Sequence, residues 1–441
     1  MTPTITGIGL ICVLCLLLAT GMPIAFALGL AAVAGLFLSM GMDVIYVMAE
    51  SMFMGTAQLT YVTIPMFVLM GGLIAGSPAG GDLYKSLDRW LYKIPGGLVL
   101  SNIGSCAIFS SMTGSSPATC AAVGKIGIPE MLQRGYPSSV AVGSIAAGGT
   151  LGILIPPSVT MIVYGISTQT SIGRLFLAGV LPGVMLTVMF MAWALVDARR
   201  KGFHFRIEGL HYTLKDKLVT LPRILPFLVI ILTMLFVLYG GVATPSEAAG
   251  AGALLTLIVV VVVYRLIHVK TLTEIFGSAM RESVMIMMIM ASAELFSFAL
   301  SSLYISQTIA AAVVELQLNR WVLMGLINVF LLFAGMFLPP VAVIVMTAPL
   351  LFPIVIEMGF DPYWFAVILT INMEIGLITP PVGLNLFVLN SIAPNVPTRE
   401  ILKSALPYVL VMMFAIVVLS FIPEIVTFLP DLVMGPTTAT P

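Results

Sequence analysis

The chain has 441 residues, of which 60% are hydrophobic and only 9% are charged, and its formal net charge at pH 7 is zero. A soluble domain needs charged side chains to cover its surface, so this composition indicates a polytopic membrane protein surrounded by lipid. The balanced charge creates no overall basic field, so no nucleic-acid partner is expected.

Long apolar runs mark the expected helices. A helix that crosses a bilayer needs about 20 apolar residues, and the pairs 98–112 with 117–129 and 322–338 with 341–356 are short or joined by tight turns. We therefore expect each pair to form a re-entrant hairpin that enters and leaves the membrane on one side. The runs fall at 5–20, 23–40, 60–76, 98–112, 117–129, 138–165, 177–197, 224–240, 247–264, 283–303, 322–338, 341–356, 363–392 and 405–428.

The positive charges fit one topology. If the N-terminus lies outside and neither hairpin crosses the bilayer, 17 of the 19 Lys and Arg residues are cytoplasmic, and only Arg174 and Arg320 are not. This distribution obeys the positive-inside rule and places both termini outside. No Lys or Arg precedes Lys85, so the first run lacks the basic region of a signal peptide and is expected to be a retained helix.

Two of the apolar runs are interrupted by glycine and proline. The first interruption is Gly148–Ser158 and the second is Glu374–Gly383, and each contains a Pro-Pro pair. Proline lacks a backbone donor and clashes with the preceding turn, so each helix should break there. Irregular backbone at membrane depth is tolerated where it lines a cavity. Two broken helices in corresponding halves indicate a transport site.

The two halves are related by a shift of 224 residues. Because an odd number of crossings separates them, the second copy should be inverted, as in transporters built from inverted repeats. The fold class is therefore an all-α polytopic membrane protein with two inverted repeats, each containing a hairpin and a broken helix. The shift maps Pro129 to Pro353, Gly135 to Gly359, Gly152 to Gly376, Pro156 to Pro380 and Pro157 to Pro381.

This pattern divides the chain into scaffold and core segments. Residues 80–95 and 304–319 are amphipathic and are expected to lie at the membrane interface before each hairpin. The expected segments are 1–97 (scaffold helices and interfacial arm), 98–197 (first core, hairpin 98–129 and broken helix 138–165), 198–223 (basic cytoplasmic linker), 224–320 (second scaffold and arm) and 321–430 (second core, hairpin 322–356 and broken helix 363–392).

The first hairpin tip, Ser110–Thr119, is rich in small hydroxyl residues. Where one helix ends and the next begins, carbonyls and amides lack helical partners. Carbonyl and hydroxyl oxygens suit a hard cation, whereas amides at a helix N-terminus suit an anion. Close helix packing by small residues is the alternative explanation. The neighbouring helix break favours two similar cation sites, each made by one tip and one break.

Polar residues of the second half allow more than one role. Intramembrane carboxylates are costly and point to function, so Glu374 either lines the site or is satisfied by packing, and Glu294 fits a helix–helix hydrogen bond. Asn372 and Asn385 flank the second break, where they bind substrate or hold the unwound backbone.

Other functional classes are less compatible with the sequence. The three histidines, His204, His211 and His268, all fall in expected cytoplasmic loops, and the sequence contains no HExxH motif and no GxxxxGK[ST] loop. We therefore expect neither an enzyme nor a chain that hydrolyses ATP. A channel is a remote alternative, because paired hairpins that close a midplane site do not form a continuous pore.

Three stretches resemble the large membrane subunit of tripartite ATP-independent periplasmic (TRAP) transporters. They are Gly149-Thr-Leu-Gly-Ile-Leu-Ile-Pro-Pro-Ser158 followed by Tyr164-Gly165, Arg174-Leu-Phe-Leu-Ala-Gly-Val-Leu-Pro-Gly183, and Gly376-Leu-Ile-Thr-Pro-Pro-Val-Gly-Leu-Asn-Leu-Phe387. The resemblance implies an elevator-type importer in the bacterial inner membrane, with periplasmic termini, driven by a sodium gradient. It also implies a separate small four-helix membrane subunit, a periplasmic solute-binding protein, and an organic anion substrate such as a C4-dicarboxylate, sialic acid or another carboxylate or sulfonate.

The resemblance also assigns site residues. It places at least two Na⁺ ions, one at Ser110, Ser111, Gly152, Ile155 and Pro157, and one at Gly335, Gly376, Thr379 and Val382. Candidate substrate contacts are Thr113, Ser115, Ser116, Glu374 and Asn385. Pro339-Pro340 departs from the polar residue that many relatives carry at the second tip, so no contact is carried over there. A stand-alone sodium-coupled carboxylate carrier of the same superfamily is the alternative function.

Overall fold

The computed structural model describes residues 3–54, 56–202, 212–219, 221–315 and 319–436, and within these ranges the chain is helical with no strand. Short 3-10 helices are η1 (Gly41–Asp43), η2 (Leu59–Val62) and η3 (Leu151–Ile153). The α-helices are α1 (Pro3–Ala19), α2 (Ile24–Met40), α3 (Val44–Met54), α4 (Thr63–Ala75), α5 (Ala79–Leu91), α6 (Gly97–Thr113), α7 (Ser116–Gln133), α8 (Ser138–Thr150), α9 (Val159–Thr168), α10 (Ile172–Arg200), α11 (Leu214–Leu218), α12 (Leu221–Tyr239), α13 (Pro245–Val262), α14 (Val269–Ser302), α15 (Ile305–Glu315), α16 (Arg320–Phe337), α17 (Pro340–Glu357), α18 (Pro362–Leu377), α19 (Leu384–Ile392), α20 (Thr398–Phe421) and α21 (Glu424–Met434).

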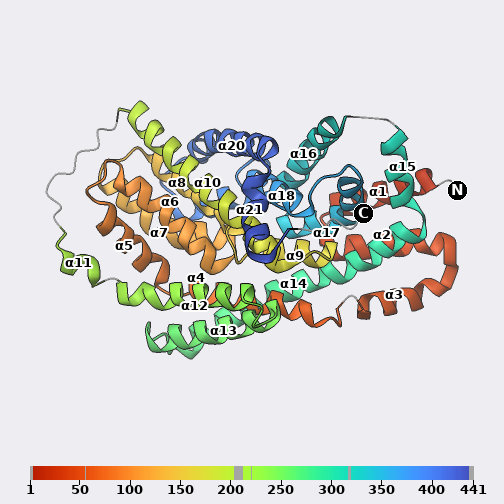
Figure 1. Ribbon diagram of the computed structural model, residues 1–441, viewed down its shortest axis with the longest axis horizontal. Helices are drawn as coiled ribbons and strands as arrows, with labels where there is room; N and C mark the ends of the chain where they lie inside the picture. Colours follow the sequence, from red (N-terminus) through yellow and green to blue (C-terminus); the bar gives the residue numbers. More distant parts are fainter. Residues whose placement is uncertain (1–2, 55, 203–211, 220, 316–318, 437–441) are drawn as a thin grey trace.

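The helices pack into an elongated body. Figure 1 shows α6 and α7 in the left half, α16 and α17 in the right half, and α14 passing below α9 and α17. Within the described residues, seven helical stretches are long and apolar enough to cross a membrane. The pair α4 and α5 is bent by 62° at its junction, so α5 turns aside before the first hairpin. These features confirm an all-helical membrane protein.

The core is densest where the hairpins and broken helices pack together. In α18 every residue from Tyr363 to Leu377 is buried, and in α8 every residue from Val140 to Thr150 is buried. Burial on every side places both helices inside the protein, and at a lipid-facing surface the polar side chains of Asn372 and Glu374 would be costly. The two broken helices therefore lie at the centre of the fold.

The first hairpin turns between Thr113 and Ser116, and the first broken helix is interrupted between Ile153 and Val159. At the turn Gly114 has φ +60°, a left-handed conformation that residues with a Cβ rarely adopt. The helix break coincides with Pro156-Pro157, whose peptide bond is cis. Turn and break therefore form where the sequence predicts them.

The second half repeats these boundaries. The second hairpin turns between Phe337 and Pro340, and the second break lies between Leu377 and Leu384. Adding 224 to the bounds of α7, 116–133, gives 340–357, the bounds of α17. The inverted orientation of the second copy stays a prediction.

Some helix bounds differ from those expected. The run 405–428 is two helices, because Pro423 cannot donate the next hydrogen bond and α20 ends at Phe421. Helix α14 begins at Val269, well before the apolar run at 283, since charged residues do not stop a helix that has good helix formers. Helices α16 and α17 have 18 residues each, long enough to cross a membrane, so their re-entrant path stays a prediction.

Charged residues fix the base of the first hairpin. The Arg134 guanidinium, beyond the end of α7, donates to both carboxylate oxygens of Asp88 on α5, at 2.9 and 2.8 Å, and also contacts Glu130 at 2.6 Å. Asp88 is buried, so this bidentate pair is shielded from solvent on one side. The middle of the basic linker, residues 203–211, and the tail 437–441 lie outside the described residues.

Candidate functional site

The first hairpin tip packs against the first helix break through backbone atoms. A Cβ added to Gly152 would lie 2.6 Å from the carbonyl carbon and oxygen of Ser115 and from the amide nitrogen of Ser116. A Cβ on Gly114 would likewise lie 2.8 Å from the carbonyl oxygen of Pro157. Such distances leave no room for a side chain, so tip and break meet only because both contribute glycine.

The second tip meets the second break in the same way. A Cβ on Gly376 would overlap the carbonyl of Gly335. In addition, the amide of Val382 donates to the carbonyl of Met336 at 3.3 Å. The structure thus brings each hairpin tip together with the helix break that the sequence pairs with it.

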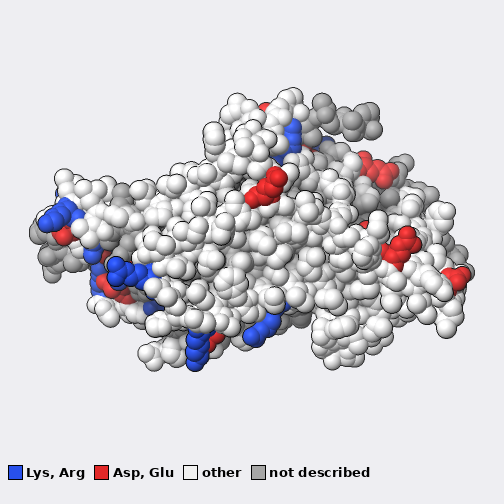
Figure 2. All heavy atoms as spheres, turned by 90° about the horizontal axis from the view of Figure 1, so that it is seen from below, with Lys and Arg blue, Asp and Glu red and all other residues white. Residues whose placement is uncertain are grey.

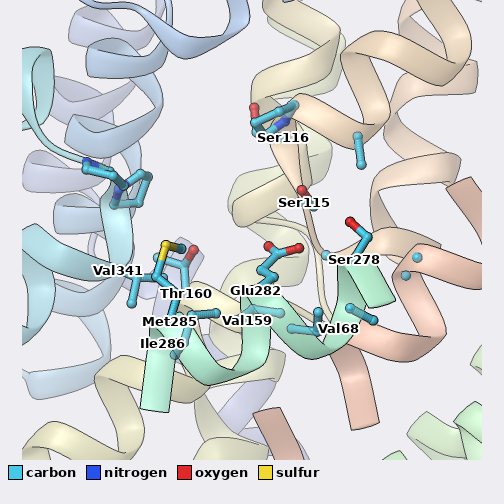
Figure 3. Close-up of a pocket in the computed structure, with 18 of the residues that line it drawn as sticks. Val68, Ser115, Ser116, Val159, Thr160, Ser278, Glu282, Met285, Ile286 and Val341 are labelled. Atoms are coloured by element: carbon cyan, nitrogen blue, oxygen red, sulfur yellow. The ribbon is translucent and has the colours of Figure 1, made fainter. Parts of the chain in front are cut away.

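A cavity of about 1080 Å³ lies between the two tips. One side is formed by the tip residues Thr113–Ala118, and another by Pro339–Ala342 of the second tip. Helix α14 forms the facing wall, with contributions from α2 and α4. Figure 3 shows Ser115 above α14 and Val341 on the opposite side of the same space. This volume accommodates a small organic molecule.

Within the described residues five helices begin at this cavity. One is α2, and each of the other four starts at a hairpin turn or a helix break and has its first residue in the cavity lining. The amides of a first helical turn lack helical partners and carry the positive end of the helix dipole. A cavity with several such ends favours a negatively charged group without needing Lys or Arg. The first residues are Ser116 of α7, Val159 of α9, Pro340 of α17 and Leu384 of α19.

Helix C-terminal ends also reach the cavity wall. Thr113 ends α6, Ile153 ends η3 and Leu377 ends α18, and all three line the cavity. The last carbonyls of a helix lack helical donors and carry partial negative charge. Oxygen atoms of this kind suit a hard cation. Backbone groups with partial positive charge and backbone groups with partial negative charge therefore lie next to each other.

The first set of candidate sodium residues offers hydroxyl oxygens with lone pairs that are available to a cation. Ser110 is fully buried, and its Oγ has no hydrogen-bond partner among the described residues. The hydroxyl of Ser111 donates to the carbonyl of Ile108 at 2.7 Å and keeps its lone pairs. Gly152 and Pro157 contact the tip, and Ile155 lies between them in the break. This donor set fits a small hard cation such as Na⁺.

The second set is arranged around backbone atoms. Gly335 and Gly376 are in contact, and the Thr379 hydroxyl donates to the carbonyl of Ile375 at 2.5 Å. Val382 follows the Pro-Pro pair, and its backbone amide is hydrogen-bonded to the tip. In the described part of the chain no group of three or more His, Cys, Asp or Glu residues is placed to hold a metal ion. The candidate ligands here are hydroxyl and carbonyl oxygens, which also fit Na⁺.

The candidate substrate residues fall into two groups. Thr113, Ser115 and Ser116 line the cavity. Asn385 lies behind this wall, and its Nδ2 donates to the hydroxyl of Ser116 at 2.8 Å. Glu374 is fully buried in α18 outside the cavity lining, and neither of its carboxylate oxygens has a hydrogen-bond partner in the described structure. Asn385 is therefore placed to position Ser116.

The polar face of α14 was not predicted from the sequence. Glu282 and Ser278 line the cavity opposite the tips, with Glu274 and Thr271 nearer the start of the helix. These residues recur at spacings of three and four, which is the signal of one helical face. These residues were not expected in a cavity because the apolar run of this helix begins at residue 283, after the last of them.

The sequence matches the family described as "Tripartite ATP-independent periplasmic transporter, DctM component" over residues 11–425. The chain belongs to this TRAP transporter family. Relatives for C4-dicarboxylate, isethionate, sialic acid and ectoine are named as permeases, in agreement with the expectation that the chain is a transporter and not an enzyme. This membership confirms the resemblance on which the candidate sites depend.

Two relatives and one solved structure show the breadth of the similarity. The "C4-dicarboxylate TRAP transporter large permease protein DctM" of Pseudomonas aeruginosa is 36% identical over 88% of this chain and 90% of its own length. The "Isethionate TRAP transporter permease protein DctMQ" of Oleidesulfovibrio alaskensis is 33% identical over 94% of this chain and 64% of its own length. The solved Alcanivorax borkumensis YdaH transporter shares the fold, with a TM-score of 0.67 at 14% identity, over 90% of this chain and 91% of that one.

Proposed function

We propose that this TRAP large permease imports an organic anion, driven by a sodium gradient, after a periplasmic solute-binding protein has delivered it. The observation that carries the proposal is the convergence of four helix N-termini on one cavity. Backbone amides bind a carboxylate or sulfonate regardless of the rest of the molecule. Relatives named for C4-dicarboxylate and for isethionate, a sulfonate, are consistent with such a substrate.

Sodium coupling follows from the adjacency of the two kinds of helix end. In the proposed mechanism one Na⁺ binds at Ser110 and Gly152, and another binds at Gly376 and Thr379. Each site lies at a contact between a tip and a break, so a bound cation holds the two together and orders the neighbouring amides. The charge of the cation also offsets the charge of the anion, which lowers the cost of moving the anion through a medium of low polarity.

We propose an elevator movement for the translocation step. The contacts Gly152–Ser115 and Gly376–Gly335 are too close for the tips to slide over the breaks. The hairpins and broken helices would therefore move as one transport domain against a scaffold formed by segments 1–97 and 224–320. The repeated helix bounds support the two inverted repeats that such a mechanism uses.

The charges on the surface support the proposed orientation in the bacterial inner membrane. Figure 2 shows Lys and Arg side chains gathered toward the left of the molecule, the end where Figure 1 places α5 and α11. At the right-hand end of Figure 2, the coloured side chains that are visible are acidic. By the positive-inside rule the basic end is cytoplasmic, and the two termini are then periplasmic.

The remaining two parts of the tripartite system are proposed as separate chains. One is a small four-helix membrane subunit that packs against the scaffold, and the other is the periplasmic solute-binding protein. The family description itself names a tripartite transporter. A stand-alone sodium-coupled carrier of the same superfamily is the alternative, and it would need no binding protein.

Uptake into proteoliposomes tests the proposal. The chain and its small membrane partner are reconstituted, and entry of a labelled C4-dicarboxylate or sulfonate is measured with and without a sodium gradient and the binding protein. Uptake that needs both confirms the tripartite importer. Uptake that needs sodium alone indicates the stand-alone carrier, and passive flux that needs neither indicates a channel.

The sodium sites are tested by removing one hydroxyl from each. Ser110→Ala and Thr379→Val should each raise the sodium concentration for half-maximal uptake about tenfold, the effect of losing about 1.4 kcal/mol of binding energy. Ser101→Ala is the matched control, because this buried serine lies on the same helix as Ser110 but donates to the carbonyl of Gly97 at 2.8 Å. An unchanged sodium dependence in both variants would refute these sites.

A further inference from the structure

The carboxylate of Glu282 projects into the cavity from α14. Figure 3 shows it pointing toward Ser115 of the first tip, with the hydroxyl of Ser278 beside it. All three residues line the cavity. Because Ser278 precedes Glu282 by four residues, both side chains occupy the same face of the helix. The cavity therefore presents an acidic group opposite the helix N-termini.

No cationic side chain of the described structure balances this charge within the cavity. The lining residues include Glu274 and Glu282 but no Lys, Arg or His. Glu282 has no hydrogen bond or ion pair to any described residue. Its neighbour Arg281 does not line the cavity, and its guanidinium lies 3.8 Å from the position of a Cβ on Gly277, one turn back on α14.

The two walls of the cavity therefore carry opposite charge. Helix N-termini supply partial positive charge on the side of the tips, and Glu282 supplies a full negative charge on the side of α14. Glu282 is exposed to the cavity and has no partner there among the described residues, so a cationic group that enters with the cargo can pair with it. A purely anionic cargo leaves the carboxylate unpaired and is repelled by it.

We propose that Glu282 binds a positively charged nitrogen of the substrate, so that this permease carries organic anions that also bear an ammonium or similar cationic group. The inference depends on the proposed function and specifies its substrate class. The carboxylate or sulfonate of the substrate lies at the N-termini of α7 and α17, and the cationic nitrogen lies between Glu282 and Ser278. Ser115, between the two, provides a hydroxyl to either group.

Matched pairs of probes test this assignment. Taurine and isethionate differ only in an ammonium in place of a hydroxyl, and aspartate differs from succinate only by an added ammonium. Binding of each probe to the purified full-length chain in lipid nanodiscs is measured by calorimetry at saturating sodium, without the binding protein, so that its selectivity does not enter. The wild-type chain should bind the ammonium member of at least one pair about tenfold more tightly than its partner.

Three variants assign the preference to one residue. Glu282→Gln should abolish the preference for the ammonium probe and leave binding of its partner unchanged or improved, whereas Glu282→Asp should retain the preference. Glu294→Gln is the matched control, since Glu294 lies on the same helix outside the cavity lining and should behave as wild type. Thermal unfolding of each variant verifies that the chain remains folded.

The outcomes separate this inference from the proposed function. Sodium-dependent binding of both members of each pair with equal affinity would overturn the role of Glu282 and leave the anion transporter intact. A preference that survives in Glu282→Gln would also overturn it. Absence of sodium-dependent binding for all four probes, in a chain shown to be folded, would contradict the proposed function as well.

Discussion

The two tip–break contacts are alike in their backbone but differ in their surroundings. In the first half Pro156 and Pro157 are buried, whereas in the second half Pro380 and Pro381 are exposed. The hairpin helices of the first half are likewise more buried than those of the second half. Most residues of α6 are buried, while α16 exposes large apolar side chains along its length, among them Phe330 and Phe333.

The difference shows that glycine and proline set the local geometry and that neighbouring helices set how firmly it is held. The first break is backed by α10, where Cβ atoms on Gly179 and Gly183 would lie 2.5 Å from the carbonyl oxygen of Leu154 and 2.7 Å from the side chain of Ile155. The base of the first hairpin is fixed by Arg134, whose counterpart in the second half is Met358. The first half should therefore be the more rigid one.

The largest expected effect comes from adding one methyl group at each break. Gly152→Ala should lower stability by about 3 kcal/mol, because its Cβ meets the tip backbone in a fully enclosed place. Gly376→Ala should cost less although Gly376 is also buried, because the Gly335 carbonyl that its Cβ overlaps belongs to α16, whose exposed outer face lets the second tip shift. Thermal unfolding in detergent and sodium-dependent uptake measure both effects.

Two other glycines serve as controls for these substitutions. Gly250 on α13 and Gly325 on α16 have nothing within 4 Å of an added Cβ. Gly→Ala at either position should leave stability unchanged or slightly increased, because alanine is the better helix former. Equal losses in Gly152→Ala and Gly376→Ala would mean that burial does not distinguish the two breaks.

An intermediate effect is expected at the base of the first hairpin. Arg134→Gln removes the bidentate pair with Asp88 and should lower stability by about 2 kcal/mol, because it leaves a buried carboxylate unpaired. Asp88→Asn and the double variant complete a double-mutant cycle. If the losses of stability in the two single variants simply add up in the double variant, the pair does not hold α5 to the hairpin. The ion pair would then not contribute to the greater rigidity of the first half.

The smallest effect is expected at a link between the halves that occurs only once. Asn385 of α19 donates to Ser116 of α7 at 2.8 Å, while the positions related by the shift of 224 residues, Met161 and Pro340, have no side-chain donor to form it. Asn385→Ala should cost about 1 kcal/mol of stability and weaken substrate affinity a few-fold. Wild-type affinity in calorimetry would mean that Asn385 does not position Ser116.

The sequence predicted the breaks and the hairpin tips because these depend on local chemistry. Two consecutive prolines remove two adjacent amide donors and interrupt a helix, whereas single prolines such as Pro182 and Pro353 lie inside helices. A turn at Gly114 needs only a residue without a Cβ. The repeat shift of 224 residues then paired each tip with its break. The repeat indicated only that each cation site pairs one tip with one break, and the individual sodium residues were expected from the resemblance to the TRAP family.

Features that depend on packing were not predictable in this way. The burial of Pro157 and the exposure of Pro381 follow from which helices lie beside them, and the two Pro-Pro pairs look alike in sequence. Glu282 precedes the apolar run, so hydropathy alone gave no reason to place it in a cavity formed by segments distant in the chain. The division of the last apolar run at Pro423 was also not predicted, because it depends on a single residue within an otherwise apolar stretch.

The four helix N-termini at the cavity have a consequence for how the cavity responds to its environment. Peptide amides do not titrate, so their attraction for an anion is the same in an acidic medium as in a neutral one. Lys and His side chains would make that attraction depend on proton concentration. The proposed attraction of the peptide groups for the anionic part of the cargo therefore stays the same when the pH outside the cell changes, whereas the proposed contact with Glu282 depends on whether that carboxylate is ionised.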